Sequence, residues 1–159
     1  MRLGLLAALC ACGAAVCASQ ARAQSNNVRI TGLSDVALGS LSSASDTKVA
    51  QNICAFSSSA TKGYHVTASG PAGGPLVLTN GGSTLAYEVQ WNGASGQSSG
   101  TNLSANVPVG GFTSSATQQQ CNSGPTTSAS LIVIVRASSA ASAAGGNYSG
   151  ALTLILGPE

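Results

Sequence analysis

Short runs of β-type residues separated by clusters of Gly, Ser, Asn and Pro most strongly constrain how this chain can fold. No segment has a convincing helical period, and the Ser and Gly content of 137–146 favours a loop with at most one short helical turn. The pattern predicts an all-β sandwich. The expected strands are 27–33, 35–41, 49–57, 63–69, 75–80, 84–92, 101–109, 130–137 and 147–156.

Two of these runs predict where the core lies. In 84–92 (TLAYEVQWN), apolar and polar residues alternate, so Leu85, Tyr87, Val89 and Trp91 are expected on one face. The run 131–135 (LIVIV) is apolar on both faces, which predicts a central strand that is covered on both sides.

The final expected strand raises a question about its partner. Tyr148, Leu152, Leu154 and Leu156 share one face of 147–156, and 157–159 (GPE) follow directly. An exposed apolar edge at this strand would be an aggregation site. We therefore expect it to pair either with an early segment of the same chain or with a strand from another molecule.

Residues 1–23 have the features of a secretory signal peptide. Arg2 is a short positive region, 3–18 are a run of small and apolar residues, and 21–23 (ARA) match a cleavage site. The run is too short and alanine-rich to be a stable membrane span. We expect export by the Sec pathway and one mature domain, 24–159, with cleavage after Ala18 or lipid modification at Cys12 as alternatives.

The mature domain has little charge. Without Arg2 and Arg22, four basic and four acidic residues remain, so the formal net charge is near zero. A basic footprint for nucleic acid and a polybasic membrane patch are both absent from this sequence.

Two cysteines remain after removal of the signal peptide. In an exported chain Cys54 and Cys121 are expected to pair, and two buried free thiols are the alternative. The bridge would close a loop of nearly seventy residues, which the loop-entropy model values at roughly 4 kcal/mol.

The order of motifs resembles a known family. An L-G element at 36–39 (VALG) precedes a strand with a cysteine, and GYHVT (63–67), LTNG (78–81) and LAYEVQW (85–91) follow. A second cysteine comes before 146–154 (GNYSGALTL), which is the most specific part. Together these segments resemble the spore-coat-protein-U-like group, which includes pilin-like subunits of archaic chaperone–usher fimbriae. The resemblance covers nearly all of the mature chain.

The resemblance implies an incomplete immunoglobulin-like β-sandwich whose final strand is supplied in trans. The implied function is a structural subunit of an extracellular fimbria, assembled by donor-strand exchange. Its implied partners are a periplasmic pilus chaperone, an outer-membrane usher and neighbouring subunits. The expected acceptor groove is formed by Leu131, Val133, Val135, Leu152, Leu154 and Leu156. Alternatives are a lectin-like tip adhesin with a surface or glycan receptor, and a stand-alone secreted protein of the same family.

The sequence departs from this family pattern at its N-terminus. If 27–33 form the first half of the first core strand, only Gln24 to Asn27 remain as an extension, and a tip position is expected. The other interpretation is that Val28, Ile30 and Leu33 belong to a segment donated to another subunit. In addition, 24–53 lack the cysteine that family pilins often carry near the first strand.

Catalytic, metal and cofactor sites are not expected. His65 is the one histidine and lies in an expected strand, which favours a surface or interface role. No G-x-S-x-G elbow supports a catalytic triad, and one histidine with two bridged cysteines is too few ligands for a metal. Tyr87 and Trp91 are expected in the core, with sugar stacking as the alternative. The loop 92–102 is expected to be a solvated connector or part of an adhesive tip.

Overall fold

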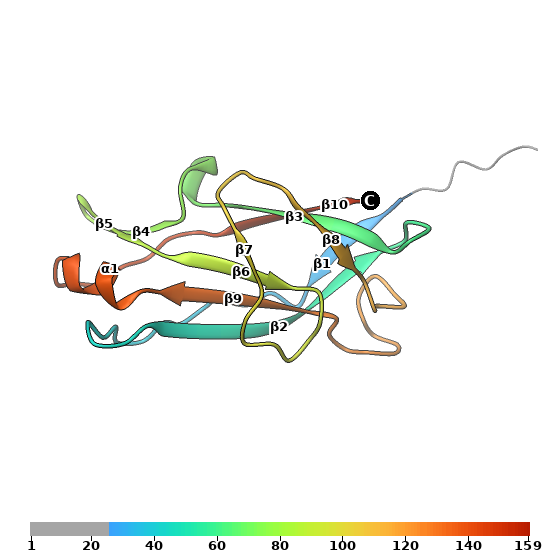
Figure 1. Ribbon diagram of the computed structural model, residues 1–159, viewed down its shortest axis with the longest axis horizontal. Helices are drawn as coiled ribbons and strands as arrows, with labels where there is room; N and C mark the ends of the chain where they lie inside the picture. Colours follow the sequence, from blue (N-terminus) through green and yellow to red (C-terminus); the bar gives the residue numbers. More distant parts are fainter. Residues whose placement is uncertain (1–25) are drawn as a thin grey trace, which may run out of the picture.

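The computed structural model describes residues 26–159, so the expected signal peptide lies outside the described part of the chain (Figure 1). The elements are β1 (Val28–Thr31), β2 (Thr47–Ser57), β3 (Gly63–Ser69), the 3-10 helix η1 (Pro71–Gly73), β4 (Val77–Asn80), β5 (Ser83–Ala86), β6 (Glu88–Asn92), β7 (Thr101–Leu103), β8 (Val109–Thr113), β9 (Ala129–Val135), α1 (Ala137–Ser142) and β10 (Thr153–Pro158).

These strands form two facing antiparallel sheets and a two-stranded ribbon (Figure 1). One sheet has the order β1-β2-β9-β6-β7, the other has the order β10-β3-β8, and β4 pairs with β5. In an immunoglobulin sandwich, strands A-B-E-D form one sheet and C-F-G the other. The order β1-β2-β9-β6 and the pair β3-β10 reproduce A-B-E-D and C-F. The fold is therefore an all-β, immunoglobulin-like sandwich, as predicted.

The core lies between the two sheets and is centred on β9. All seven residues of β9 are buried, in agreement with the prediction for 131–135. Leu131, Val133 and Val135 join the main apolar cluster between the sheets. Ile132 and Ile134 face outward, where Gln90 and Glu88 of β6 lie beside them in register.

The expected strand at 35–41 is not present. Between β1 and β2 the chain has no strand pairing, although Val36, Leu38 and Leu41 still pack against the core. The expected strand at 147–156 likewise begins only at Thr153, and 147–152 make a single bridge, between Ser149 and Thr79. In both stretches apolar residues pack against the core, as their alternation predicts. Neither stretch has a partner strand with which to form a backbone ladder.

The expected strand 84–92 is divided at Tyr87. β5 pairs with β4, whereas β6 pairs with β9 and β7, so the chain changes sheets between them. At the change, the Tyr87 N–H donates to the Leu76 carbonyl at 3.1 Å. Side-chain alternation continues across the division, and Leu85, Tyr87, Val89 and Trp91 are all buried.

The expected strand 101–109 ends at Leu103. Asn106 has a φ of +62° and its N–H donates to the Ala68 carbonyl, which turns the chain. β8 follows and was not predicted, because VGGFT has weak strand propensity. In 137–146, where a loop was expected, α1 forms a short helix.

Candidate functional site

An open groove lies between the strap, defined as residues 32–46 joining β1 to β2, and the segment that leads into β10. The groove has an inner half of about 420 Å³ and an outer half, beside α1, of about 640 Å³. The two halves share five bordering residues and are therefore continuous: Asp35, Val36, Leu38, Leu78 and Gly150.

The inner half of the groove is apolar. Leu131 and Val133 of β9 form the floor of the groove together with Tyr87, and Leu152 and Leu154 line it from the β10 side. Leu131, Val133 and Tyr87 are buried, whereas Leu152 and Leu154 are half-buried. The outer half is bordered by 143–150, which is rich in Gly, Ala, Asn and Ser. The groove therefore suits apolar side chains at its inner half and smaller or polar ones near α1.

The two walls of the groove run in opposite directions. In the inner half, strap residues 33–38 lie across from 150–154, and in the outer half 35–41 lie across from 143–150. A strand entering the groove would therefore be antiparallel to one wall and parallel to the other. Both kinds of strand pairing form backbone ladders.

The groove side of β10 is an unpaired strand edge. Within residues 26–159, β10 pairs with β3 alone. The Glu159 N–H donates to the Gly63 carbonyl, and β10 continues this register with Gly157 opposite His65. Because backbone groups alternate sides along a strand, those of Leu154 and Leu156 point to the open edge. Pro158 has no N–H, so a backbone ladder on this edge ends there.

One end of the strap is held by the amide side chain of Gln51. Its Nε2 donates to the Ser34 carbonyl at 2.8 Å, and its Oε1 accepts from the Ser34 N–H at 3.3 Å. Gln51 lies beside Leu131 in the register of β2 and β9. A polar residue therefore stands next to the groove floor and binds the strap as a backbone strand would.

The other end of the strap is held at Asp46. Its carboxylate accepts from the Ala137 N–H at the start of α1 and from Arg136 Nη1 at 2.7 Å. Arg136 also donates to both carboxylate oxygens of Glu88. The Ala137 N–H and the Arg136 guanidinium lower the pKa of Asp46, and Arg136 lowers that of Glu88. One arginine thus joins the strap, β6 and α1.

The residues proposed from sequence for an acceptor groove lie in two places. Four border the groove: Leu131, Val133, Leu152 and Leu154. Val135 and Leu156 belong to the same apolar cluster but do not border it. Val28 and Ile30 are half-buried in β1, which pairs with Cys54–Ser57 at the end of β2, while Leu33 lies in the strap and is exposed.

Sequence reasoning missed the opposite wall. The strap was expected to be a core strand, so Val36 and Leu38 were not considered as groove residues. Leu78 and Gly150 were also missed, because they come from segments far apart in the chain. The sequence signal that could have revealed this wall was the apolar alternation of the L-G element in a stretch with no obvious partner strand.

The aromatic residues considered for sugar stacking are buried. Trp91 is fully buried, and its Nε1–H donates to the Tyr64 hydroxyl at 3.2 Å. Tyr87 is 7% exposed at the groove floor. The loop after β6 is fixed to the outer face by hydrogen bonds from Gly96 N–H to Asn52 and from Gln97 N–H to Ser130.

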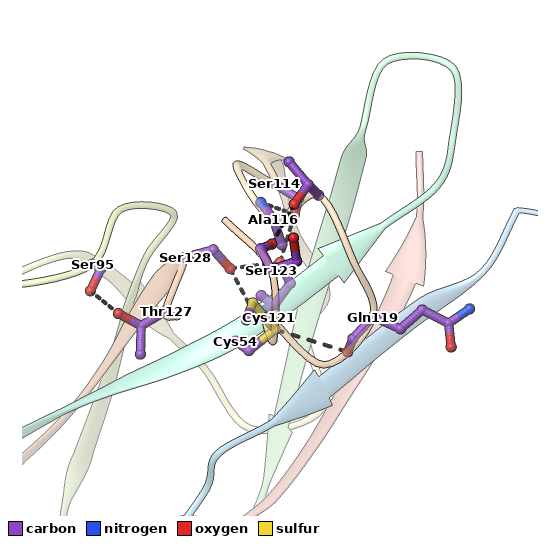
Figure 2. Close-up of a disulfide and its surroundings, with 11 residues drawn as sticks. Cys54, Ser95, Ser114, Ala116, Gln119, Cys121, Ser123, Thr127 and Ser128 are labelled. Atoms are coloured by element: carbon purple, nitrogen blue, oxygen red, sulfur yellow. Dashed lines mark hydrogen bonds between the residues drawn. A yellow bond between two sulfur atoms is a disulfide. The ribbon is translucent and has the colours of Figure 1, made fainter. Parts of the chain in front are cut away.

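Cys54 and Cys121 form a disulfide with a Cα–Cα distance of 5.9 Å (Figure 2). The bond fixes the 114–128 connection to β2. Ser114 and Ser128 both donate their hydroxyls to the Ala55 carbonyl, at 2.6 and 2.8 Å, next to the disulfide. These hydrogen bonds satisfy buried backbone groups of β2 where its pairing with β9 has ended.

Neither a metal site nor a membrane-spanning helix is found in residues 26–159. In this part of the chain, no three His, Cys, Asp or Glu residues are grouped so that they could hold a metal ion. No helix here is long and apolar enough to cross a membrane.

No family model matches the chain, and no curated protein matches it. Among solved structures, the chain is similar to one from a chaperone–tip adhesin complex described as vital for activation of CFA/I fimbriae biogenesis. The TM-score is 0.48 and the sequence identity is 13%. The match covers 84% of this chain but only 43% of the solved chain, so this chain spans less than half of that protein's length. The strand order alone establishes the immunoglobulin-like fold.

Proposed function

We propose that the chain is a non-enzymatic structural subunit of an extracellular fimbria of the chaperone–usher type. In this proposal the groove accepts a β-strand supplied by another protein, which pairs with the open edge of β10. The observation that carries the proposal is the unpaired edge of β10, whose Leu154 borders an apolar groove.

The position of the groove supports this role. The seventh strand of an immunoglobulin sandwich pairs with strand F, and β10 occupies the place of F. An added strand would provide backbone partners for β10 and cover Leu131, Val133, Leu152 and Leu154. These changes remove the edge and the exposed apolar surface that otherwise favour aggregation.

The N-terminal segment has its own place in the proposal. Val28 and Ile30 lie in β1, paired with β2, which supports their assignment to the first core strand. With this assignment the subunit accepts a strand through its groove without giving up β1, and we propose a tip position for it. Its partners would be a periplasmic pilus chaperone, an outer-membrane usher and an adjacent subunit, after export to the periplasm.

A pair of neighbouring substitutions in β10 tests the groove. Leu154 borders the groove, whereas Ile155 points away and is 58% exposed. The protein is exported to an oxidising periplasm with and without a fimbrial chaperone, and the complex is isolated by affinity purification. Leu154→Lys is expected to lose the chaperone because it places a charge in the apolar groove. Ile155→Lys is expected to retain it.

Thermal unfolding of the wild type provides the second measurement. The chain alone is expected to aggregate or unfold at low temperature, and its unfolding temperature is expected to rise with the logarithm of the chaperone concentration. A monomer with a sharp, high-temperature transition that the chaperone does not change would refute strand acceptance. Equal chaperone binding by Leu154→Lys and Ile155→Lys would refute the groove as its site.

A further inference from the structure

The strap is a wall of the groove that carries few bonds of its own. Over 36–45 it makes no hydrogen bond to another element. The hydrogen bonds that hold it come from Gln51 at one end and, at the other, from Arg136 and the Ala137 N–H to Asp46. Gly32 and Gly39 have φ values of +82° and +66°, which glycine adopts without strain. Few hydrogen bonds therefore oppose a change in the position of the strap, and its remaining contacts are the apolar ones of Val36, Leu38 and Leu41 with the core.

The strap also has an apolar surface that faces the apolar residues on the β10 side of the groove. Val36 and Leu38 lie across the groove from Leu152 and Leu154, and all four are only half-buried. Closing the gap would remove apolar area from water, which is favourable in proportion to that area. The strap would also bring backbone donors and acceptors to the open edge of β10.

The bonds of Gln51 oppose this closure. Gln51 holds Ser34 against β2, the strand on the far side of the groove floor from β10. We propose that Gln51 is a latch that keeps the strap away from β10, and that the strap closes over the edge of β10 when the latch is released. With the latch in place, the groove is open to a strand from another protein. With the latch released, the strap itself covers the edge of β10. This inference rests on the proposed function for its biological role, but not for its test.

The latch is tested by hydrogen exchange in the oxidised, purified chain without any partner. Short labelling pulses at low temperature and low protein concentration are followed by mass spectrometry with fragmentation that resolves single amides. The reporters are the N–H groups of Leu154 and Leu156, which point to the open edge. In the wild type they are expected to exchange almost as fast as unprotected amides.

Gln51→Ala is expected to slow exchange at Leu154 and Leu156 by about tenfold or more, the protection expected from one new backbone hydrogen bond. Gln51→Glu can still accept from the Ser34 N–H but cannot donate to its carbonyl, so it is expected to give an intermediate rate. The Ser34 N–H is expected to exchange faster in Gln51→Ala. A general loss of stability would instead accelerate exchange at all of these amides.

The matched control is Asn52→Ala. Asn52 is the next residue in β2, and its side chain binds Gly96 in the outer loop and not the strap. This variant is expected to leave the rates of hydrogen exchange at the Leu154 and Leu156 amides unchanged. Unchanged or faster exchange at these amides in Gln51→Ala, or equal slowing in Asn52→Ala, would overturn the latch.

The same variants separate the latch from the proposed function. If Gln51→Ala protects the edge and also slows chaperone binding, both the latch and its role are supported. If it protects the edge while the wild type binds no chaperone, the latch stands and the fimbrial role fails. If chaperone binding occurs but the edge is not protected in Gln51→Ala, the latch fails alone.

Discussion

The indole N–H of Trp91 donates a hydrogen bond to the hydroxyl of Tyr64 across the core, and the two rings meet edge-on, with centroids 6.3 Å apart. Both residues are fully buried. This contact joins β6 in one sheet to β3 in the other. It therefore links the two layers by a directional bond in a core that has few aromatic residues.

Tyr64→Phe is expected to leave the Trp91 N–H without its acceptor in a buried position. The cost is about 1–3 kcal/mol in the free energy of unfolding, because a buried unsatisfied donor loses its hydration without compensation. Urea unfolding followed by Trp91 fluorescence measures the loss. Tyr148→Phe is the control, because its hydroxyl binds the Ala144 carbonyl at an exposed site. Equal losses in both variants would show that the buried Trp91 hydrogen bond contributes no more to the free energy of unfolding than the exposed one of Tyr148.

Burial raises the pKa of Tyr64, and the hydrogen bond from Trp91 offsets part of this rise. Burial also raises the pKa of Tyr87. A folded pKa above the unfolded value of about 10 means that stability is complete below pH 10 and is lost as pH rises above it. The urea midpoint is expected to fall between pH 10 and 12. Tyr64→Phe/Tyr87→Phe should have a shallower pH dependence, and an equal slope would contradict this assignment.

Removal of the disulfide is expected to destabilise the domain strongly. Cys54 and Cys121 are 67 positions apart, and the loop-entropy model predicts a loss of about 4 kcal/mol for a loop of this size. The double variant Cys54→Ala/Cys121→Ala is compared with the wild type by denaturant unfolding under oxidising and reducing conditions. The reductant should destabilise the wild type alone. A wild type indifferent to reductant would show that the bond adds little.

The ion pairs of Arg136 with Asp46 and Glu88 predict that the stability of the domain depends on pH in acid. The pKa of Asp46 and that of Glu88 are lowered, so their contribution is present above about pH 4.5 and is lost as pH falls through the folded pKa values. Asp46→Asn is expected to weaken this acid dependence in thermal melts. Asp35→Asn removes the same charge from a position without a salt bridge and serves as the control. Identical acid profiles for both variants would exclude the ion pair as the cause.

Glu159 fixes the end of β10 to β8. Its carboxylate accepts from the Gly111 N–H at 2.9 Å, and its own N–H donates to the Gly63 carbonyl. Glu159→Ala is expected to cost about 1 kcal/mol and to increase hydrogen exchange at the end of β10. Glu159→Gln keeps an acceptor oxygen and should retain most of the stability. If the Gln variant is as unstable as the Ala variant, the charge is what matters.

Much of the sandwich could be predicted because side-chain alternation is a local property. The buried face of 84–92 and the fully buried β9 both follow from the order of residues along one strand. The break at Tyr87 could not be predicted, because it depends on the Leu76 carbonyl, a partner from another segment. β8 was missed because Gly110 and Gly111 weaken strand propensity, and tertiary contacts with β3 and Glu159 compensate.

The groove could be predicted only in part for the same reason. Leu152 and Leu154 were found from the apolar face of the last strand. The strap was interpreted as a strand because Val36 and Leu38 alternate like strand residues, yet it has no backbone ladder. The role of Gln51 could not be seen in sequence, since a polar residue in a strand usually indicates an exposed position.

The disulfide and the groove occupy different parts of the sandwich. Cys54 is near the end of β2 that pairs with β1, whereas the groove extends towards α1, which lies at the other end of the molecule (Figure 1). Among residues 26–159, no cysteine borders the groove. Oxidation of the two cysteines therefore involves none of the residues that border the groove. In the proposed function, a freshly exported chain would be oxidised first and would meet its partner later. A cell could then distinguish immature chains from finished ones by thiol chemistry alone, before assembly begins.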